Sequence, residues 1–510
     1  MSRARQLAAL VIAAIGVGPA AVQAQLAQPQ LEDANRVATS AEVEDRSGEP
    51  NRLRTGIEVG LVLTFATIRY QFDGERKKNW DFPSLKQRFT LEAWRYDNNP
   101  FGINNLWHAV EGYFFHIAAR SNNLSLPESF AVGFLASFAW EFAFEFKEKV
   151  SINDVLFTPT TGVTVGEFFH WLGRYLDSAP DGGGIGHSIA RWTLAFPYAL
   201  HRKLDGRGAG RIEVEAELDN LGLRADIWHR FSLGASGTQL SGDVDGAEML
   251  YAGNASAKLV AVRNYRRPGS IDLAFKNANF TEASYELVRG SDANGSRFRA
   301  ESILVGLFRQ KLDASNHGHG WLLGAALAYD YRREQLGNWR DRASLLHLPG
   351  LALEGEVHRG PLTARGGIRL HGDFVSMEAP AHAMWKAANP EVVEKTILRK
   401  QGYYFGWGGS VRAFLEVDKT RGFPVSLGAS VLAGKYDSQE NLDRNQETIE
   451  ADIDVDTTLI DIDAHLRVGL RPEWPSLEIR ASHQMRDSAQ EGFEFSGQIT
   501  RLGAGLVYAF

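Results

Sequence analysis

The sequence contains no cysteine among its 510 residues. A disulfide framework, a thiolate metal site and a cysteine nucleophile are therefore all excluded. A protein without them has to be held together by a packed core or by a closed, hydrogen-bonded sheet. A concentrated basic patch is also absent, and the net charge is −7. This charge pattern predicts no nucleic-acid partner.

Long apolar runs are scarce as well. After the first 24 residues, none reaches the roughly 20 residues that a membrane-spanning helix requires. If the chain crosses a membrane, it must therefore do so as a β-barrel, the other architecture that satisfies every backbone group in lipid. The 51 glycines and the 11% of aromatic residues suit such a barrel, with its tight turns and interfacial rings.

The first residues predict export from the cytoplasm. Arg3 and Arg5 form a positive start, residues 7–17 are apolar, and small residues follow as far as Ala24. This order is typical of a secretory signal peptide, which we place at residues 1–24. Residues 25–53 are rich in Gln, Ala, Glu and Asp and show no period. They are predicted to form a flexible lead.

Residues 54–72 are predicted to form the first strand of a barrel, because the odd positions from Ile57 to Phe65 are all apolar. Residues 73–205 are predicted to follow as a helical insert. Within this insert, apolar residues recur at helical spacing in four stretches, which are residues 103–120, 127–148, 163–177 and 188–203. The chain is therefore expected to leave the barrel for helices and then to return.

Residues 206–510 alternate apolar and polar residues and are predicted to form the β-barrel. In the clearest case, Ile460–Val468, apolar residues occupy the even positions. In a soluble sandwich the apolar face would meet a second sheet, whereas in an outer-membrane barrel it meets lipid. Long strands, aromatic residues near strand ends and a last strand ending in Phe510 favour the barrel. The predicted fold is mainly β, an antiparallel outer-membrane β-barrel of about 12 strands with an inserted α-helical domain.

The most specific pattern lies at residues 101–177. In chain order it contains Asn104, Asn105, His108, Gly112, Tyr113, Ala119, Arg120, Ser121, Glu128, Ser129, Trp140, Glu141, Glu145, Ser151, Asn153, Asp154, Thr158, Gly162, Gly166 and Glu167. These positions resemble a bacterial envelope family catalogued as domain of unknown function 3943. One departure is Ala109, where the family usually has proline. The resemblance implies an envelope location, often with a barrel following, and brings no established activity.

Polar residues of this pattern share faces of the predicted helices. Glu141, Glu145 and Glu148, for example, are spaced three or four apart. One interpretation is a buried structural network that docks the helices into the lumen or against the barrel rim, with every group hydrogen-bonded. The predicted members of this network are Asn105, His108, Arg120, Glu141, Glu145, Asn153, Asp154 and Glu167.

Two functional interpretations stand beside the structural one. Carboxylate and imidazole groups on neighbouring helices form metal sites in helical bundles. The candidate ligands for a divalent metal are His108, Glu141, Glu145, Glu167 and His170. A general acid–base site would instead pair His108 with Glu141 or Glu167, which makes these three residues the catalytic candidates.

These alternatives predict different functions for one location, the cell outer membrane. The first is a barrel with a helical plug or periplasmic cap, in a structural, transport or envelope-maintenance role. The alternative is a barrel-associated enzyme that acts on envelope lipid through the histidine and glutamate residues of the insert. A soluble periplasmic β-protein fits the strand lengths and Phe510 less well. The expected partners are outer-membrane lipid and the outer-membrane assembly machinery, which would bind the strand ending in Phe510.

Overall fold

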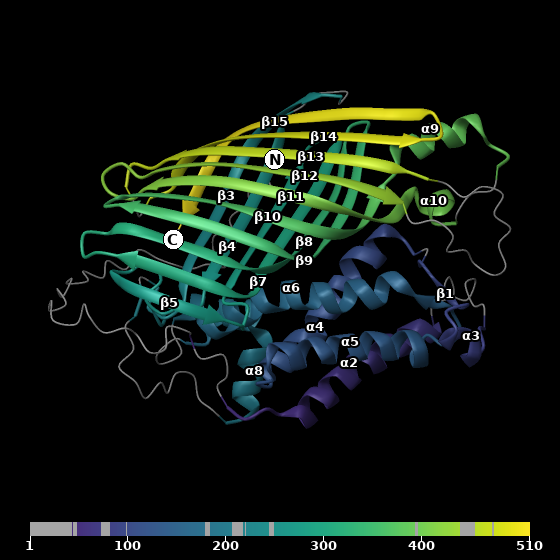
Figure 1. Cartoon of the computed structure of the whole chain (residues 1–510), viewed down its shortest axis with the longest axis horizontal. Helices are drawn as coiled ribbons and strands as arrows, with labels where there is room; N and C mark the ends of the chain where they lie inside the picture. Colours follow the sequence, from purple (N-terminus) through teal and green to yellow (C-terminus); the bar gives the residue numbers. More distant parts are fainter. Residues whose placement is uncertain are drawn as a thin grey trace.

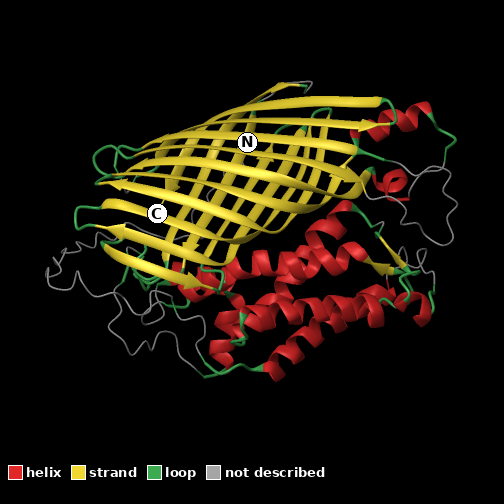
Figure 2. Cartoon of the chain, viewed as in Figure 1, coloured by secondary structure: helices red, strands yellow, loops and turns green. Residues whose placement is uncertain are grey.

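The structure is a computed structural model of the whole chain, and it describes residues 43, 48–72, 82–97, 99–178, 184–206, 218–219, 221–243, 249–392, 396–438, 454–471 and 474–509. The predicted signal peptide, most of the predicted lead and Phe510 lie outside these residues. Within that lead, Val43 is buried beside Trp171. A barrel of long strands and a group of helices lie side by side (Figures 1 and 2).

Twelve strand positions close into the barrel, and all neighbouring strands are antiparallel. The last strand closes on the first, with Tyr508 opposite Leu233. The antiparallel barrel predicted from the sequence is therefore confirmed. Its strands are β3 (Trp228–Gly242), β4 (Leu250–Val260), β5 (Gly269–Phe275), β6 (Phe280–Arg289), β7 (Ala293–Leu312), β8 (His317–Leu336), β9 (Trp339–Arg359), β10 (Leu362–Glu378), β11 (Tyr403–Lys419), β12 (Val425–Ser438), β13 (Asp456–Val468), β14 (Ser476–Gln490) and β15 (Phe493–Ala509).

Two short strands, β5 and β6, share one position of the ring. Both pair with β7, β6 with its first half and β5 with its second. Between them Ala278 has a left-handed backbone, with φ at 49°. The side-chain amide of Asn279 donates to the carbonyl oxygen of Ala261 at 3.0 Å. The 13 paired strands therefore fill twelve positions, an even number, as bacterial outer-membrane barrels have.

The alternation in the sequence becomes an alternation of faces. In β13, Asp461 and Asp463 line a cavity in the lumen, while Ile462 lies between them on the outer face and is 44% exposed. An apolar wall around a polar lumen is the arrangement of an outer-membrane barrel. Exposed apolar residues of the outer wall include Leu353, Ile368, Val411, Leu427, Leu477 and Leu502.

The helical region occupies residues 52–204 and includes a two-residue parallel strand pair, β1 with β2. Among the described residues, no helix combines the length and the apolar character needed to cross a membrane. The elements are α2 (Arg52–Phe72), α3 (Leu85–Phe89), β1 (Trp94–Arg95), the π-helical η2 (Ile103–Trp107), α4 (His108–Ser121), α5 (Leu126–Ala139), the π-helical η3 (Trp140–Phe144), β2 (Val150–Ser151), α6 (Ile152–Leu176), α7 (Ile185–Leu194) and α8 (Phe196–Leu204), and the barrel loop after β10 adds α9 (Pro380–Ala388) and α10 (Thr396–Gln401).

The predicted first strand at residues 54–72 is wrong, because this segment forms the 21-residue helix α2. Its apolar residues also satisfy a helical spacing, and Val59, Leu63 and Tyr70 are buried against other helices. A short apolar run does not distinguish a strand from a helix by its period alone. As a result, the helices are not inserted into the barrel. The helices of residues 52–204 all precede the first barrel strand, and only the short α9 and α10 lie between barrel strands.

The helices cover one side of the barrel wall from outside, and α6 lies closest to the strands (Figure 1). The ring of Phe157 packs against Tyr329 and Phe374, with centroids 6.0 and 5.7 Å apart. The neighbours of these two residues, Asp330 and Asp373, face the lumen. Tyr329 and Phe374 therefore face outward. The predicted plug or periplasmic cap is wrong, since the outer wall carries the aromatic side chains that the helices bury.

Apolar clusters fill the lumen toward both ends. At the end with the short turns, the β4–β5 connection places Tyr265 inside, 5.5 Å from the ring of Phe308. At the opposite end, α9 contacts β14 and β15. Its Trp385 donates from Nε1 to Glu491 at 2.7 Å and is buried in a cluster with Tyr436. A polar section of lumen remains between the two clusters.

Candidate functional site in the helical region

Three glycines let α4 and α6 approach closely. A Cβ atom on Gly112 would lie 1.9 Å from the carbonyl oxygen of Thr158. A Cβ atom on Gly162 would lie 2.6 Å from the carbonyl oxygen of Gly112, and one on Gly166 would lie 2.5 Å from the ring of His116. Only glycine fits such contacts without moving a neighbour. The polar faces of the two helices therefore meet along their length.

One buried ion group joins these helices, and it consists of Glu167, Arg120 and His116. Glu167 lies 2.7 Å from Nε of Arg120 and 2.6 Å from Nε2 of His116. Glu167 is 0% exposed. Burial would raise its pKa, but Arg120 and His116 hold the pKa below its ordinary value. A carboxylate that stays charged and fully paired is suited to holding helices together rather than to proton transfer.

A second group, termed the acid cluster, lies at the opposite end of α4 and α6. It consists of Glu141, Glu145 and Asp154, whose carboxylate oxygens lie within 4.8 Å of one another. Glu141 accepts from the backbone N–H of Ser151 at 2.7 Å, and Glu145 accepts from Nε1 of Trp140 at 3.1 Å. Oε1 of Glu141 is buried and has no hydrogen-bond partner among the described residues. The cluster could hold a metal ion.

His108 stands beside the acid cluster. Its Nε2 lies 3.2 Å from Oδ1 of Asp154, and its Nδ1 lies 3.6 Å from Glu111. The side-chain amide of Asn153 donates to the same Oδ1 at 2.6 Å, and its oxygen accepts from the backbone N–H of Asp97 at 2.8 Å. Asp154 is thereby hydrogen-bonded to an amide and lies at ion-pair distance from the imidazole of His108, whose Nε2 makes no hydrogen bond among the described residues.

Burial and mutual repulsion make the acid cluster bind protons tightly. Burial, reinforced by Glu145 and Asp154, raises the pKa of Glu141 well above its usual range. Burial also raises the pKa of Asp154 to about 7, although His108 opposes the shift. Burial by itself would lower the pKa of His108, but Asp154 and the other nearby carboxylates raise it to about 9. Near neutral pH the cluster therefore holds protons that a bound cation would displace.

Both π-helical segments that the structure describes border the acid cluster. Glu141 lies within η3, and η2 ends immediately before His108. π-helical turns are rare and occur frequently at functional sites, because the extra residue redirects nearby side chains. Their position therefore singles out the acid cluster, and not the ion group around Glu167, as the candidate site.

Sequence reasoning missed the basic residues behind the cluster. Arg88 donates to the carbonyl oxygens of Glu141 at 2.7 Å and of Phe146 at 2.6 Å. Burial lowers the pKa of Arg88, and the charge of Glu141 partly offsets this effect. Arg95 contacts Glu148 at 3.1 Å. Both arginines precede the predicted helices, and nothing in their spacing marks them as buried.

The structure divides the predicted site residues between two places. His108, Glu141 and Glu145 lie in or beside the acid cluster, together with Asp154. Glu167 belongs to the ion group at the other end of α4 and α6. His170 contacts the hydroxyl of a tyrosine in α8. The five predicted metal ligands therefore do not form one site, and the three catalytic candidates divide in the same way.

Two asparagines of the pattern hold the helices on the barrel wall. The side chain of Asn104 donates to the hydroxyl of Tyr403 at 3.0 Å. The side chain of Asn105 donates to Ser376 at 3.1 Å, and the backbone carbonyl oxygen of Asn105 accepts from the hydroxyl of Tyr329 at 2.8 Å. These contacts place η2, and therefore the start of α4, at a fixed point on the outer wall.

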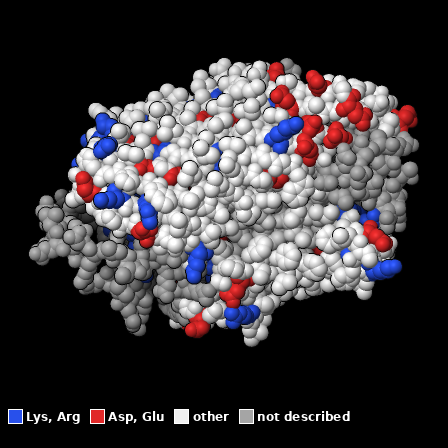
Figure 3. Space-filling view, in the orientation of Figure 1, with Lys and Arg blue, Asp and Glu red and all other residues white. Residues whose placement is uncertain are grey.

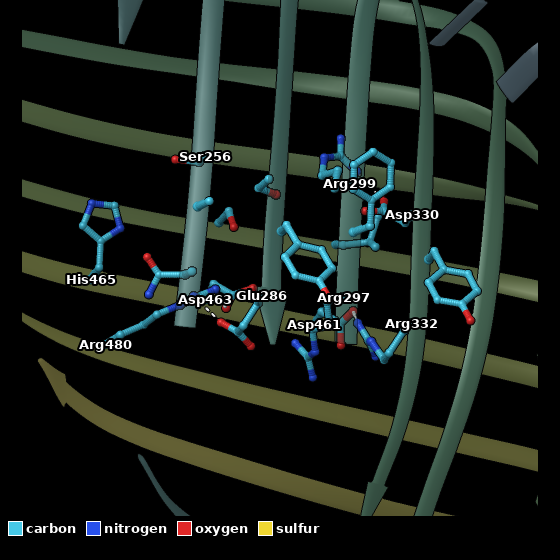
Figure 4. A pocket seen from close by; sticks show the side chains of 18 of the residues that line it. Ser256, Glu286, Arg297, Arg299, Asp330, Arg332, Asp461, Asp463, His465 and Arg480 are labelled. Carbon is cyan, nitrogen blue, oxygen red and sulfur yellow. Dashed lines mark hydrogen bonds and ion pairs between the residues drawn. The ribbon is translucent and has the colours of Figure 1, made fainter. Parts of the chain in front are cut away.

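A separate cavity of about 300 Å³ lies in the barrel lumen. Charged side chains reach into it from facing strands (Figure 4). Arg480 contacts Glu286 at 2.6 Å and Asp463 at 3.2 Å, while Arg332 pairs with Asp461. Opposite charges neutralise one another here, so the cavity offers no concentration of one charge comparable to the acid cluster.

The helical region also matches a known family of sequences. Residues 93–196 match the family model described as Domain of unknown function (DUF3943). The match confirms the resemblance predicted at residues 101–177. This DUF3943 segment contains the acid cluster, the ion group and the docking asparagines. No curated protein matches the chain.

Solved structures similar to the barrel include a porin. The chain is 12% identical to the NanC porin, with 54% of this chain and 98% of that chain covered and a TM-score of 0.25. OmpT of Vibrio cholerae is 9% identical, with 56% of this chain and 97% of that chain covered and a TM-score of 0.21. The translocator domain of the autotransporter NalP from Neisseria meningitidis is 14% identical, with 60% of this chain and 96% of that chain covered and a TM-score of 0.17. The barrel fold follows from the strand pairing itself, in which β15 closes on β3.

Proposed function

We propose that the protein is an outer-membrane component with a role in envelope maintenance, in which the barrel anchors the DUF3943 segment. The observation that carries this proposal is the pair of apolar clusters in the lumen, around Tyr265 at one end and Trp385 at the other. A porin keeps a continuous water-filled channel. Here a cavity of about 300 Å³ lies between the clusters, which supports an anchoring role over transport.

The same proposal includes location and partners. The apolar outer wall fits the lipid of an outer membrane. Assembly there requires export and recognition of the last strand, β15. Buried and more exposed residues largely alternate along this strand, which ends at Ala509. The predicted signal peptide and Phe510, which would serve these two steps, lie outside the described residues. Removal of Phe510 is expected to lower the amount of assembled barrel in cell envelopes.

Planar-bilayer recording tests the anchoring role. The full-length protein should show no steady open-channel current. Combined Tyr265→Ala and Trp385→Ala substitution should introduce such a current, because it removes the largest side chains from both clusters. A gel-mobility shift on heating would show that the variant barrel is folded. A steady porin-like current from the unsubstituted protein would refute the proposal.

A second candidate function is an enzyme that acts on envelope lipid. One observation favours it, namely the unpartnered Oε1 of Glu141 beside Glu145 and Asp154. Carboxylate oxygens are the ligands that Mg²⁺ and Ca²⁺ prefer, so these three residues would hold such a cation. A bound cation would polarise an ester or phosphate oxygen. His108, protonated near neutral pH, is placed to act as a general acid.

Metal binding and lipid analysis test this second function. The full-length protein, titrated with Mn²⁺ and followed by electron paramagnetic resonance, should bind about one ion per chain. Glu141→Gln should abolish binding, whereas the matched variant Glu111→Gln, changed outside the cluster, should retain it. In cells, Glu141→Gln should alter envelope lipid composition at unchanged barrel levels. Absence of stoichiometric metal together with unaltered lipid would eliminate the enzyme and leave the anchoring role.

A further inference from the structure

The side of α2 that faces away from the other helices is largely apolar, with the exposed Thr64 and Arg69 as exceptions. Its exposed residues are spaced three or four apart and lie opposite the buried residues Val59, Leu63 and Tyr70. A surface helix of a water-soluble region would carry polar residues on this side. The exposed apolar residues are Leu53, Ile57, Leu61, Phe65, Ile68 and Phe72.

A second apolar surface runs along α5 into η3. The rings of Phe130, Phe134, Phe138 and Phe142 form a continuous ladder, with centroids 6.4, 6.3 and 4.0 Å apart. Phe130 and Phe134 are exposed, as is the neighbouring Leu135 at 62%. Large contiguous apolar surfaces of this kind mark a site of contact with a partner or a membrane.

Charges on the helices fall into two layers with an uncharged layer between them. Residues 59–68 of α2, 129–140 of α5 and η3, and 155–166 of α6 contain no Asp, Glu, Lys or Arg. Twelve helical residues span about 18 Å. One border of this layer holds the ion group and the Arg52–Glu128 pair, and the other holds the acid cluster. The lipid-facing band of an outer-membrane barrel is about 25 Å tall, which is a similar height.

The uncharged layer of the helices continues onto the barrel wall. Figure 3 shows the charged side chains in separate groups, at the left, the upper right, the lower right and the lower edge of the view, with a largely uncharged surface between them. The outer wall of the barrel carries exposed leucine, isoleucine and valine side chains. A protein partner would impose no such spacing of charges, whereas a lipid layer imposes it on everything that it contacts.

We propose that membrane acyl chains cover the outer sides of α2 and α5, so that the helical region lies in the lipid layer beside the barrel. This inference rests on the proposed outer-membrane location. It goes beyond that location because it assigns the DUF3943 segment a place in the bilayer, with the acid cluster at its border.

The absence of cysteine makes a direct test possible, since each single-cysteine variant carries one label. The variants are Leu61→Cys on α2, Leu135→Cys on α5, Leu427→Cys on the barrel wall and Ser315→Cys in the exposed β7–β8 turn. Each full-length variant is labelled with bimane and placed in phosphatidylcholine vesicles with brominated acyl chains. Labels on Leu61→Cys and Leu135→Cys should lose at least half as much fluorescence as the label on Leu427→Cys, and iodide should quench only Ser315→Cys.

Other outcomes would overturn the inference. Quenching of the α2 and α5 labels by iodide would place this face in water. Protection from both quenchers would show that protein covers it, either a second copy or another part of the chain. Failure of lipid quenching at Leu427→Cys would instead refute the outer-membrane location itself, so the two failures are distinguishable.

Discussion

The barrel lumen and the acid cluster bury charge in opposite ways. In the lumen most charges have a partner of opposite sign, such as Arg369 with Glu301 at 2.7 Å and Arg365 with Glu354 at 2.9 Å. In the acid cluster three carboxylates lie together. Burying a charge is costly in both places, but pairing offsets the cost in the lumen, while the cluster must bind protons or a cation. Charges in the lumen are therefore neutralised by pairing, whereas the cluster has raised pKa values of the kind that also occur at functional sites.

The largest effect is expected where pairing is complete within the helical region. Glu167→Gln leaves Arg120 buried without a full counter-charge and should lower the free energy of unfolding by about 3–5 kcal/mol. The matched lumen variant Asp463→Asn should cost less than about 1 kcal/mol, because Arg480 keeps Glu286 and is partly exposed. Urea unfolding followed by circular dichroism measures both. Equal losses would show that complete burial of the ion group around Glu167 does not raise the cost of removing a counter-charge above its cost in the lumen.

A smaller effect is expected from the helix contact that assembles the site. Gly112→Ala places a methyl group against the carbonyl oxygen of Thr158 and should cost roughly 1–3 kcal/mol by overpacking. The control is Gly133→Ala on α5, where the nearest atom would lie at 3.8 Å. It should gain about 0.4–1 kcal/mol through the unfolded chain. A neutral Gly112→Ala would show that α4 and α6 can separate without loss.

The last prediction concerns the change of stability with pH. The pKa of Asp154 is raised to about 7, so the folded chain holds this proton more tightly, and stability falls as the pH rises toward 7. The raised pKa of His108 stabilises the fold at low pH, and this contribution is lost as the pH rises through about 9. Metal-free protein should therefore melt at a lower temperature at pH 9 than at pH 6.

Control variants separate the contribution of Asp154 to the pH dependence from the contributions of other groups. Asp154→Asn should remove the fall in melting temperature below pH 7. Added Mg²⁺ should turn this fall into a rise if the acid cluster binds the ion. Glu167 acts only at acid pH, because its pKa is lowered and its stabilisation is lost as the pH falls. A melting temperature that rises from pH 6 to pH 9 in metal-free protein would contradict the assignment.

Much of the fold could be predicted from the sequence, because period-two alternation in a barrel strand is enforced by two different solvents. Strands such as β13 follow it over their whole length. The error at residues 54–72 has the opposite cause, since α2 has apolar residues on two sides and its alternation is accidental. The position of the helices outside the wall was not predictable. It depends on aromatic residues of β8 and β10, and in the sequence these residues cannot be told apart from other outward-facing strand residues.

The site was predictable only in part. Residue types and helix faces identified Glu141, Glu145 and His108, but not that Glu167 lies at the other end of the helices. That division depends on how α4 and α6 align, which the contact of Gly112 with Thr158 sets. The π-helical turns leave no mark in a periodicity search. Arg88 was missed because it lies outside any predicted helix.

The contact between Asn104 and Tyr403 joins residues 299 positions apart in the chain. Every barrel-strand residue that the DUF3943 segment touches is synthesised after the segment itself. The helices contact one another over short sequence separations, which favours early folding. Their docking, in contrast, has to await a wall whose strands come last. The order of synthesis therefore makes docking of the helices a late event, which takes place only after the barrel strands that they contact have formed.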